Sequence, residues 1–276
     1  MTEFFGIDEL IAAALREDIG FGDITTLSCV DEAAVSSGLF RAKEDGVVCG
    51  LFILPRVFAA LDNAVAVTAL TGEGSPVRAG EIIAEIEGPS RAVLTGERVA
   101  LNFLQHLSGI ATKTAAAVRA VRGTNAKIID TRKTTPGLRA LEKYAVRAGG
   151  GHNHRFGLGD GVLIKDNHIK AAGGIANAVA RARAAAPHTL KIEVETETLE
   201  QVSEALSSGA DIIMLDNMTT ETMAEAVRLI AGRALTEASG NMGDRDLREV
   251  AETGVEFISV GGLTHSVRAL DISLKF

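Results

Sequence analysis

The second half of the chain alternates short apolar runs with longer amphipathic segments. Six apolar runs rich in β-branched residues predict strands, at residues 126–131, 161–165, 190–195, 211–216, 234–239 and 257–262. Segments with helical spacing of apolar residues lie between them, at residues 137–148, 174–186, 198–208, 219–231 and 243–253. Alternating strands and helices form parallel sheets, and continuous apolar runs are typical of strands buried on both faces. We therefore predict a parallel α/β architecture.

The spacing of these strands favours a barrel over an open sheet. The last five end at fairly even intervals, near residues 165, 195, 216, 239 and 261. A dinucleotide-binding open sheet would carry a glycine-rich loop after its first strand, whereas here the first strand runs into Arg132-Lys133-Thr134-Thr135-Pro136. Residues 112–276 are also shorter than the roughly 200–250 residues of a complete eightfold barrel. We predict an incomplete, open βα barrel whose gap something else must cover.

The first part of the chain predicts a smaller unit of strands and helices. Residues 7–16 have helical apolar spacing. Short strand-like runs follow at residues 35–42, 46–52 and 64–70. Residues 72–89 resemble the hammerhead of lipoyl and biotinyl carriers, but no lysine stands at a hairpin tip, so a carrier function is disfavoured.

A long helical stretch at residues 91–122, interrupted at Ser108-Gly109, joins the two parts. We place the domain boundary inside it. Residues 1–110 are predicted to form the first domain and residues 111–276 the barrel. Packing of the last residues against the first domain stays open.

Composition excludes several classes of protein. The chain has 276 residues, 46% of them hydrophobic, which is ample for a core, and only 4% aromatic, with no Trp. A net charge of −8 argues against general binding of nucleic acid or an anionic membrane. The two cysteines form no CxxC motif. Neither a signal peptide nor a membrane span is evident, so we expect a cytoplasmic protein.

One cationic segment stands inside this acidic chain. Residues 127–170 contain nine Lys or Arg and four Asp or Glu, a local net charge of +5, together with three of the six histidines. Such a segment suits a small polyanionic ligand, and a solvated helix surface bridged by ion pairs is the alternative.

Charged and small residues follow the predicted barrel strands. They are Arg132, Lys133, Lys165, Glu195, Asp216, Ser239-Gly240-Asn241 and Gly261-Gly262. In βα barrels the carboxyl ends of the strands carry the active site, so these residues should converge. Glu195 and Asp216 offer hard oxygen ligands suited to Mg²⁺ carried with a phosphate. The small-residue turns suit phosphate, because their backbone N–H groups can approach it closely.

His152 and His154 have a spacing that could ligate a metal from a strand. No third soft ligand is evident beside them, so a transition-metal site is disfavoured. The preceding Gly149-Gly150-Gly151 allows a sharp turn or a close approach of the backbone.

Several motifs resemble the quinolinate phosphoribosyltransferase family, also called carboxylating nicotinate-nucleotide diphosphorylases. The longest is TRKTTPGLRALEKYAVRAGGGHNHRFGLGDGVLIKDNHI at residues 131–169. Shorter ones are EDIGFGDITT (17–26), GERVALNFLQHLSGIAT (96–112), EVE (193–195), MLDN (214–217), EASGN (237–241) and ISVGGLTHS (258–266). The resemblance covers nearly the whole chain in order. Ala148 and Gly262 depart from it, since Cys and Ala are common there, with little expected consequence.

The resemblance implies transfer of phosphoribose from phosphoribosyl pyrophosphate to quinolinate with loss of CO₂, in de novo NAD biosynthesis. It implies an N-terminal α/β sandwich domain at residues 1–110. It also implies Mg²⁺ and a homodimer in which the partner's N-terminal domain covers the open barrel. By motif, the quinolinate residues are Arg98 (from the partner), Arg132, His154, Arg155 and Lys165. Lys133 is able to reach either substrate, and Glu195 and Asp216 hold ribose and metal. The remaining substrate-binding residues are Thr131, Ser239, Gly240, Asn241, Val260, Gly261, Gly262 and His265.

Two alternatives stay open at this point. A group associated with molybdate transport shares this fold, and a non-catalytic nucleotide sensor or scaffold is also conceivable. The complete set of cations together with Glu195 and Asp216 favours the quinolinate enzyme.

Overall fold

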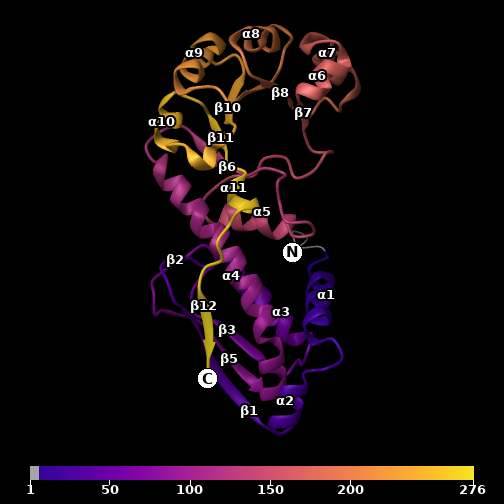
Figure 1. Ribbon diagram of the computed structural model, residues 1–276, viewed down its shortest axis with the longest axis vertical. Coiled ribbons are helices and arrows are strands. Elements are labelled where there is room, and N and C mark those ends of the chain that lie inside the picture. The colour runs from indigo at the N-terminus through magenta and orange to yellow at the C-terminus, as the bar shows by residue number, and fades with distance from the viewer. Residues whose placement is uncertain (1–5) are drawn as a thin grey trace. The chain divides into compact units, whose positions relative to one another are not determined.

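The computed structural model describes residues 6–276, which fall into two compact units. The first comprises the chain up to Ala115, with Thr135–Gly150 and Ser266–Phe276 added to it. The second comprises Ala116–Thr134 and Gly151–His265. Each unit has its own principal sheet (Figure 1).

The first unit is an α/β sandwich around a four-stranded antiparallel sheet in the order β12-β1-β5-β3. Its strands are β1 (Val35–Ala42), β2 (Gly46–Val47), β3 (Ala66–Ala69), β4 (Pro76–Val77), β5 (Ile82–Pro89) and β12 (Ile272–Lys275). Its helices are α1 (Ile7–Ile19), α2 (Ile24–Cys29), η2 (Leu51–Ile53, a 3₁₀ helix), α3 (Leu54–Ala59), α5 (Arg139–Ala148) and most of α4 (Ser90–Ala120). Strand β1 places Phe40 beside Ala84 of β5 and Leu274 of β12, and all three are buried. The last strand of the chain thus completes the core of the first unit.

Helix α4 continues through Ser108-Gly109, so the predicted interruption is wrong. Both positions are small because other segments touch the helix there. The backbone N–H of Cys49 donates to Ser108 Oγ at 2.9 Å, and a Cβ on Gly109 would lie 2.3 Å from the carbonyl oxygen of Arg268. The small residues mark close packing on the helix instead of its end.

The strand predicted at residues 46–52 is also shorter than expected. Strand β2 ends at Val47, and Gly50, with a φ of 105°, turns the chain into the 3₁₀ helix η2. A left-handed glycine stops the extended backbone that the apolar residues alone predict.

The second unit is the predicted incomplete βα barrel, with six parallel strands in the order β6-β11-β10-β9-β8-β7. These are β6 (Lys127–Ile129), β7 (Val162–Ile164), β8 (Ile192–Thr196), β9 (Ile212–Asp216), β10 (Leu235–Ser239) and β11 (Phe257–Ser259). The helices are α6 (Asp166–Ala172), α7 (Ile175–Ala185), α8 (Leu199–Ser207), α9 (Thr220–Ile230), η3 (Met242–Asp244), α10 (Leu247–Glu252) and α11 (Gly262–His265). Helices α7 to α10 form an arc outside the strands (Figure 1).

Three details of this unit differ from the predicted elements. Helices α6 and α11 fall outside the predicted helices, and the helix expected at residues 243–253 is divided into η3 and α10. Asp246 causes the division, because its side chain caps α10 by accepting from the backbone N–H groups of Arg248 and Glu249.

Candidate active site

One face of the parallel sheet carries the glutamates of the second unit's central strands. The register pairs Glu195 with Met214 and Met214 with Glu237, so both glutamates point to the same side. On the opposite face, Val194, Ile213 and Ala238 are fully buried. Burial on both faces is confirmed at the centre of the sheet, where Met214 and Glu237 are 4% and 2% exposed. The face toward the barrel interior carries acids that the apolar runs did not predict, whereas the face toward the helices is mostly apolar.

Lys165 and Glu195 meet at the carboxyl ends of β7 and β8. The Lys165 ammonium lies 2.5 Å from Glu195 Oε2, with the lysine side chain 46% exposed and the glutamate 13%. The backbone N–H of Lys165 donates to His168 Nδ1 at 2.9 Å, which fixes the start of α6. The cation is thus held at the entrance of the barrel interior.

Asp216 and Ser239 end the next two strands side by side. Asn217 has a φ of 54° and donates from Nδ2 to Asp216 Oδ2 at 2.6 Å. Gly240 follows with a φ of 92°, and a Cβ there would lie 2.7 Å from the backbone nitrogen of Asn217. Only glycine permits this approach of the two turns. Asn241, also left-handed at φ 52°, leads into η3.

Lys133 lies beside the turn that follows β11. A Cβ on Gly261 would be 3.3 Å from both the His265 ring and the Lys133 side chain. Thr264 Oγ1 donates to the Lys133 carbonyl oxygen at 2.7 Å, which anchors the lysine backbone to α11. The structure thus brings together the Lys133, Gly261 and His265 predicted from sequence.

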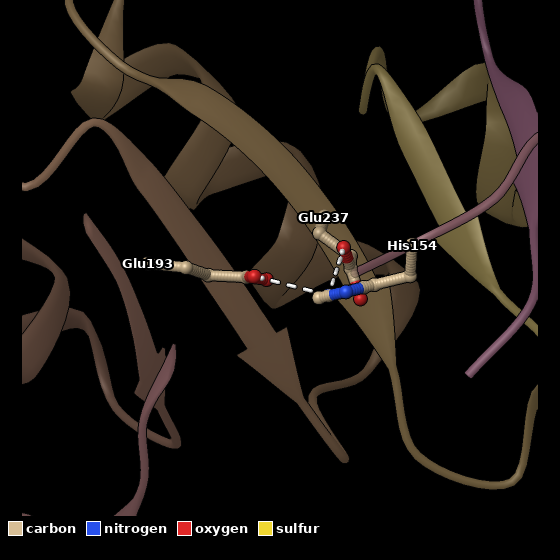
Figure 2. A group of neighbouring side chains, drawn as sticks. All are labelled: His154, Glu193 and Glu237. Atoms are coloured by element: carbon tan, nitrogen blue, oxygen red, sulfur yellow. Dashed lines mark ion pairs between the residues drawn. The ribbon is translucent and has the colours of Figure 1, made fainter. Parts of the chain in front are cut away.

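His154 faces two buried glutamates inside the barrel (Figure 2). Its Nε2 lies 3.0 Å from Glu193 Oε2 and 3.6 Å from Glu237 Oε2. Burial, reinforced by the Glu193 carboxylate, raises the pKa of Glu237 well above its ordinary value. His154 and the two glutamates also form a group whose possible ligand atoms all lie within 4.8 Å of one another.

Arg155 is a partly desolvated cation next to a second arginine. Its Nη1 donates to the Gly161 carbonyl oxygen at 2.9 Å, but its buried Nε has no hydrogen-bond partner among the described residues. Burial lowers the pKa of Arg155, and the charge of Arg132 lowers it further. Two neighbouring guanidinium groups and an unsatisfied donor together favour an anionic ligand.

The remaining predicted residues occupy varied places. Thr131 Oγ1 accepts from the Lys133 backbone N–H at 3.0 Å, and buried Val260 donates its N–H to the Ile129 carbonyl at 3.0 Å. Gly262 begins α11. Arg98 belongs to the first unit, on α4, where it is exposed and pairs with no other described residue.

Three buried acids of this interior escaped the sequence interpretation: Asp130, Glu193 and Glu237. Asp130 Oδ1 accepts from the backbone N–H of His154 at 2.9 Å, and Asp130 Oδ2 accepts from Asn153 Nδ2 at 2.5 Å. The sequence did contain a signal for these acids, because acidic and apolar residues alternate in the EVE run at residues 193–195. Such alternation in a strand covered by helices marks a polar barrel interior.

Family models match both parts of the chain. The model described as the quinolinate phosphoribosyl transferase N-terminal domain matches residues 23–108, and the C-terminal domain model matches residues 110–275. Among curated proteins, a probable carboxylating nicotinate-nucleotide pyrophosphorylase of Bacillus subtilis is 51% identical, over 97% of this chain and 92% of its own. The carboxylating nicotinate-nucleotide pyrophosphorylase of Mycobacterium leprae is 44% identical, over 99% and 98%.

Solved structures agree with these sequence matches. The crystal structure of NadC from Streptococcus pyogenes superimposes with a TM-score of 0.93 at 46% identity, covering 99% of this chain and 96% of that one. The similarity therefore extends through both units.

Proposed function

The chain belongs to the quinolinate phosphoribosyltransferase family and is a decarboxylating pentosyltransferase of NAD biosynthesis, and we propose how its own residues carry out that reaction. The substrates are quinolinate and phosphoribosyl pyrophosphate. The products are nicotinate mononucleotide, pyrophosphate and CO₂.

The observation that carries the residue assignment is the buried, unpartnered Nε–H of Arg155 beside Arg132. Quinolinate is a dianion with carboxylates on adjacent ring carbons. A guanidinium fork binds one carboxylate in a planar, bidentate manner, and a second cation is needed for the other. Arg155, Arg132 and Lys165 are assigned to this dianion, and His154 lines the same pocket beside Arg155.

Glu195 and Asp216 are assigned to the ribose hydroxyls and to Mg²⁺. Each carboxylate has one oxygen engaged by a neighbouring side chain, Lys165 for Glu195 and Asn217 for Asp216. The second oxygen of each makes no hydrogen bond to another described residue, and two carboxylates at the mouth of a barrel suit a hard cation that keeps several waters. When bound with the diphosphate, Mg²⁺ supplies positive charge to the leaving group.

Lys133 and the two small-residue turns are assigned to the phosphates. Ser239, Gly240 and Asn241 form one turn, and Gly261 and Gly262 form the other, with His265 beside it. Their backbone N–H groups and the Lys133 ammonium complement negative charge. As the bond from ribose to pyrophosphate breaks, positive charge develops on the ribose, and Lys133 stabilises the departing anion.

Decarboxylation follows from the charge of the new nucleotide. Attack by the ring nitrogen on ribose makes that nitrogen cationic. The adjacent carboxylate then leaves as CO₂, and its electron pair remains on the ring carbon, where the cationic nitrogen stabilises it. No covalent nucleophile is needed. The arginines must therefore orient the departing carboxylate without stabilising it more than the transition state.

We also propose a homodimer in which Arg98 binds quinolinate in the partner's barrel. Arg98 is exposed and without a partner among the described residues of its own chain. Large apolar side chains are exposed in both units: Phe21, Ile24 and Leu27 in the first, and Phe156 and Leu158 in the second. Exposed apolar clusters of this kind are typical of surfaces covered by another chain.

Cytoplasmic location is proposed on chemical grounds. The two cysteines are free, Cys29 exposed and Cys49 buried, which suits a reducing compartment. Within the described residues, no helix has both the length and the apolar character to cross a bilayer.

The test compares quinolinate with nicotinate, which lacks the carboxylate next to the ring nitrogen. With Mg²⁺ and phosphoribosyl pyrophosphate, quinolinate turnover should release CO₂. Nicotinate should be disfavoured in kcat/KM by roughly 10³-fold or more, because a missing carboxylate leaves desolvated cations unpaired. Arg155→Ala should shrink this preference, and Arg228→Ala, at an exposed arginine of α9, should not. Equal wild-type use of both acids would contradict the assignment.

A further inference from the structure

The proposed function assigns no role to the two glutamates that face His154. Glu193 and Glu237 are 4% and 2% exposed, and the Oε1 atom of each is buried without a partner among the described residues. Acidic side chains supply no positive charge to a barrel interior that must bind a dianion. Their presence therefore requires an explanation other than contact with substrate.

The hydrogen bonds around His154 define its tautomer. The backbone N–H of Arg155 points at His154 Nδ1, with an N···N distance of 2.6 Å. A backbone amide only donates, so Nδ1 carries the lone pair and the ring proton lies on Nε2. This Nε2–H is directed at the glutamates, 3.0 Å from Glu193 Oε2 and 3.6 Å from Glu237 Oε2 (Figure 2).

The same tautomer disfavours a metal ion held by this group. A metal would need the Nε2 lone pair, which would move the ring proton to Nδ1. That proton would then face the Arg155 N–H, donor against donor. Metal-binding histidines normally have an acceptor behind the other nitrogen, and here the position is held by a donor. The glutamates therefore face the ring nitrogen that carries the proton.

We propose that Glu193 and Glu237 are positioning residues for quinolinate binding, which act by fixing His154 and, through it, Arg155. The segment is held at three points. Asp130 Oδ1 accepts the His154 backbone N–H at 2.9 Å, the ring Nε2 lies 3.0 Å from the Glu193 carboxylate and 3.6 Å from that of Glu237, and the ring Nδ1 accepts the Arg155 backbone N–H. These contacts restrain the backbone at Arg155 and thereby limit the positions that its guanidinium group can adopt. This inference rests on the assignment of Arg155 to quinolinate.

A double-mutant cycle tests whether the glutamates act through the histidine. Glu193→Ala should raise the KM for quinolinate about tenfold or more, as loss of a hydrogen bond to a charged group predicts. The KM for phosphoribosyl pyrophosphate should change by less than about twofold. In a His154→Ala background, Glu193→Ala should have no further effect on the KM for quinolinate, because the element through which it acts is gone. Additive effects of the two substitutions would overturn the proposal.

Conservative variants separate positioning from general stability. Glu193→Gln and Glu237→Gln retain an acceptor oxygen for the ring N–H, so both should recover most of the quinolinate affinity lost in the alanine variants. Glu256→Ala is the matched control. Glu256 is another acid of the second unit, whose carboxylate accepts from the Thr236 backbone N–H at 2.8 Å. It should lower thermal stability without selectively raising the KM for quinolinate. Failure of both glutamine variants to recover affinity would contradict the proposal.

A measurement without substrate keeps this inference separate from the proposed function. Nitrogen NMR of histidine-labelled protein should show His154 Nδ1 as the unprotonated nitrogen in the wild type. In Glu193→Ala the tautomer mixture should shift toward the Nδ1-protonated form. A protonated Nδ1 in the wild type overturns the inference, whatever the substrate. The expected tautomer together with equal use of quinolinate and nicotinate would instead overturn the proposed function.

Discussion

The Lys165 ammonium and the Glu195 carboxylate form an ion pair of 2.5 Å at the carboxyl ends of two neighbouring strands. The lysine is assigned to quinolinate and the glutamate to ribose and metal. Each side chain therefore neutralises the charge of the other until a ligand binds to one of them. Because the lysine is nearly half exposed, the pair adds little to stability and can separate at low cost.

Removal of metal is the first test of this arrangement. Chelation with EDTA should abolish turnover, and excess Mg²⁺ should restore it, because Glu195 and Asp216 are hard oxygen donors assigned to that ion. Glu195→Gln and Asp216→Asn should each lower kcat by about 10²-fold or more, as loss of electrostatic stabilisation predicts. Steady-state assays at several Mg²⁺ concentrations measure this. Full activity in EDTA would contradict the metal assignment.

Mixing two inactive variants tests the role of Arg98. Arg98→Ala and Lys165→Ala should each be nearly inactive, because each removes one cation from every site. After subunit exchange, a heterodimer would contain one site with both wild-type residues, so activity should recover to about a quarter of the wild-type value in an equal mixture. Native mass spectrometry checks the exchange. Exchange without recovery would argue that Arg98 does not act across an interface.

Substitution of Gly240 should damage the turn beside Asp216. A Cβ would lie 2.3 Å from Asn217 Oδ1, and the φ of 92° is itself unfavourable for alanine. Gly240→Ala should lower the free energy of unfolding by about 1–3 kcal/mol and raise the KM for phosphoribosyl pyrophosphate. Gly243→Ala is the control, since nothing lies within 4 Å of a Cβ there. Urea denaturation and steady-state kinetics measure both effects, and equal behaviour of the two variants would contradict this account.

The raised pKa of Glu237 predicts a pH-dependent stability difference. Burial is its main cause, followed by the Glu193 carboxylate. Between the unfolded value of about 4.3 and the raised folded value, the folded state binds more protons than the unfolded state. Stability therefore falls as pH rises through that window. The neutral amide of Glu237→Gln does not titrate, so this loss of stability is absent in the variant. In the wild type, the loss amounts to about 1.4 kcal/mol for each unit by which the folded pKa of Glu237 exceeds its unfolded pKa.

Urea denaturation should therefore show that the free energy of unfolding of Glu237→Gln exceeds that of the wild type by an amount that increases as pH rises through this window. Glu225→Gln, at an exposed position on α9, controls for the loss of one negative charge. A stability difference for Glu237→Gln that does not change with pH would contradict the raised pKa of Glu237.

Ala231 offers a stabilising substitution away from the site. It is the C-terminal cap of α9 and has a left-handed backbone, with φ 50° and ψ 41°. Glycine adopts this conformation without strain, so Ala231→Gly should raise the free energy of unfolding by about 1 kcal/mol. Ala186→Gly provides the contrast, because Ala186 caps α7 with a φ of −75°. It should give no gain, and thermal denaturation distinguishes the two.

The sequence by itself determined the order of the parallel strands along the chain and the positions of several candidate site residues. Apolar runs at near-regular spacing predicted the six parallel strands and the incomplete barrel. Lys165, Glu195, Asp216 and Ser239 were identifiable because they stand where those runs end, and parallel strands bring their carboxyl ends together. The local sequence pattern sufficed to predict the strands and the residues at their ends, because both follow from where each apolar run stops and in which direction the strand runs.

Only the tertiary structure decided which polar residues meet. His154 accepts the backbone N–H of Arg155 at Nδ1 and lies beside Glu193 on β8 and Glu237 on β10, and no local pattern pairs these strands with that loop. The continuity of α4 through Gly109 is likewise a product of close packing with a segment distant in sequence. Side-chain hydrogen bonds and close packing depend on distances of a few tenths of an ångström between remote segments, which spacing along the chain does not encode.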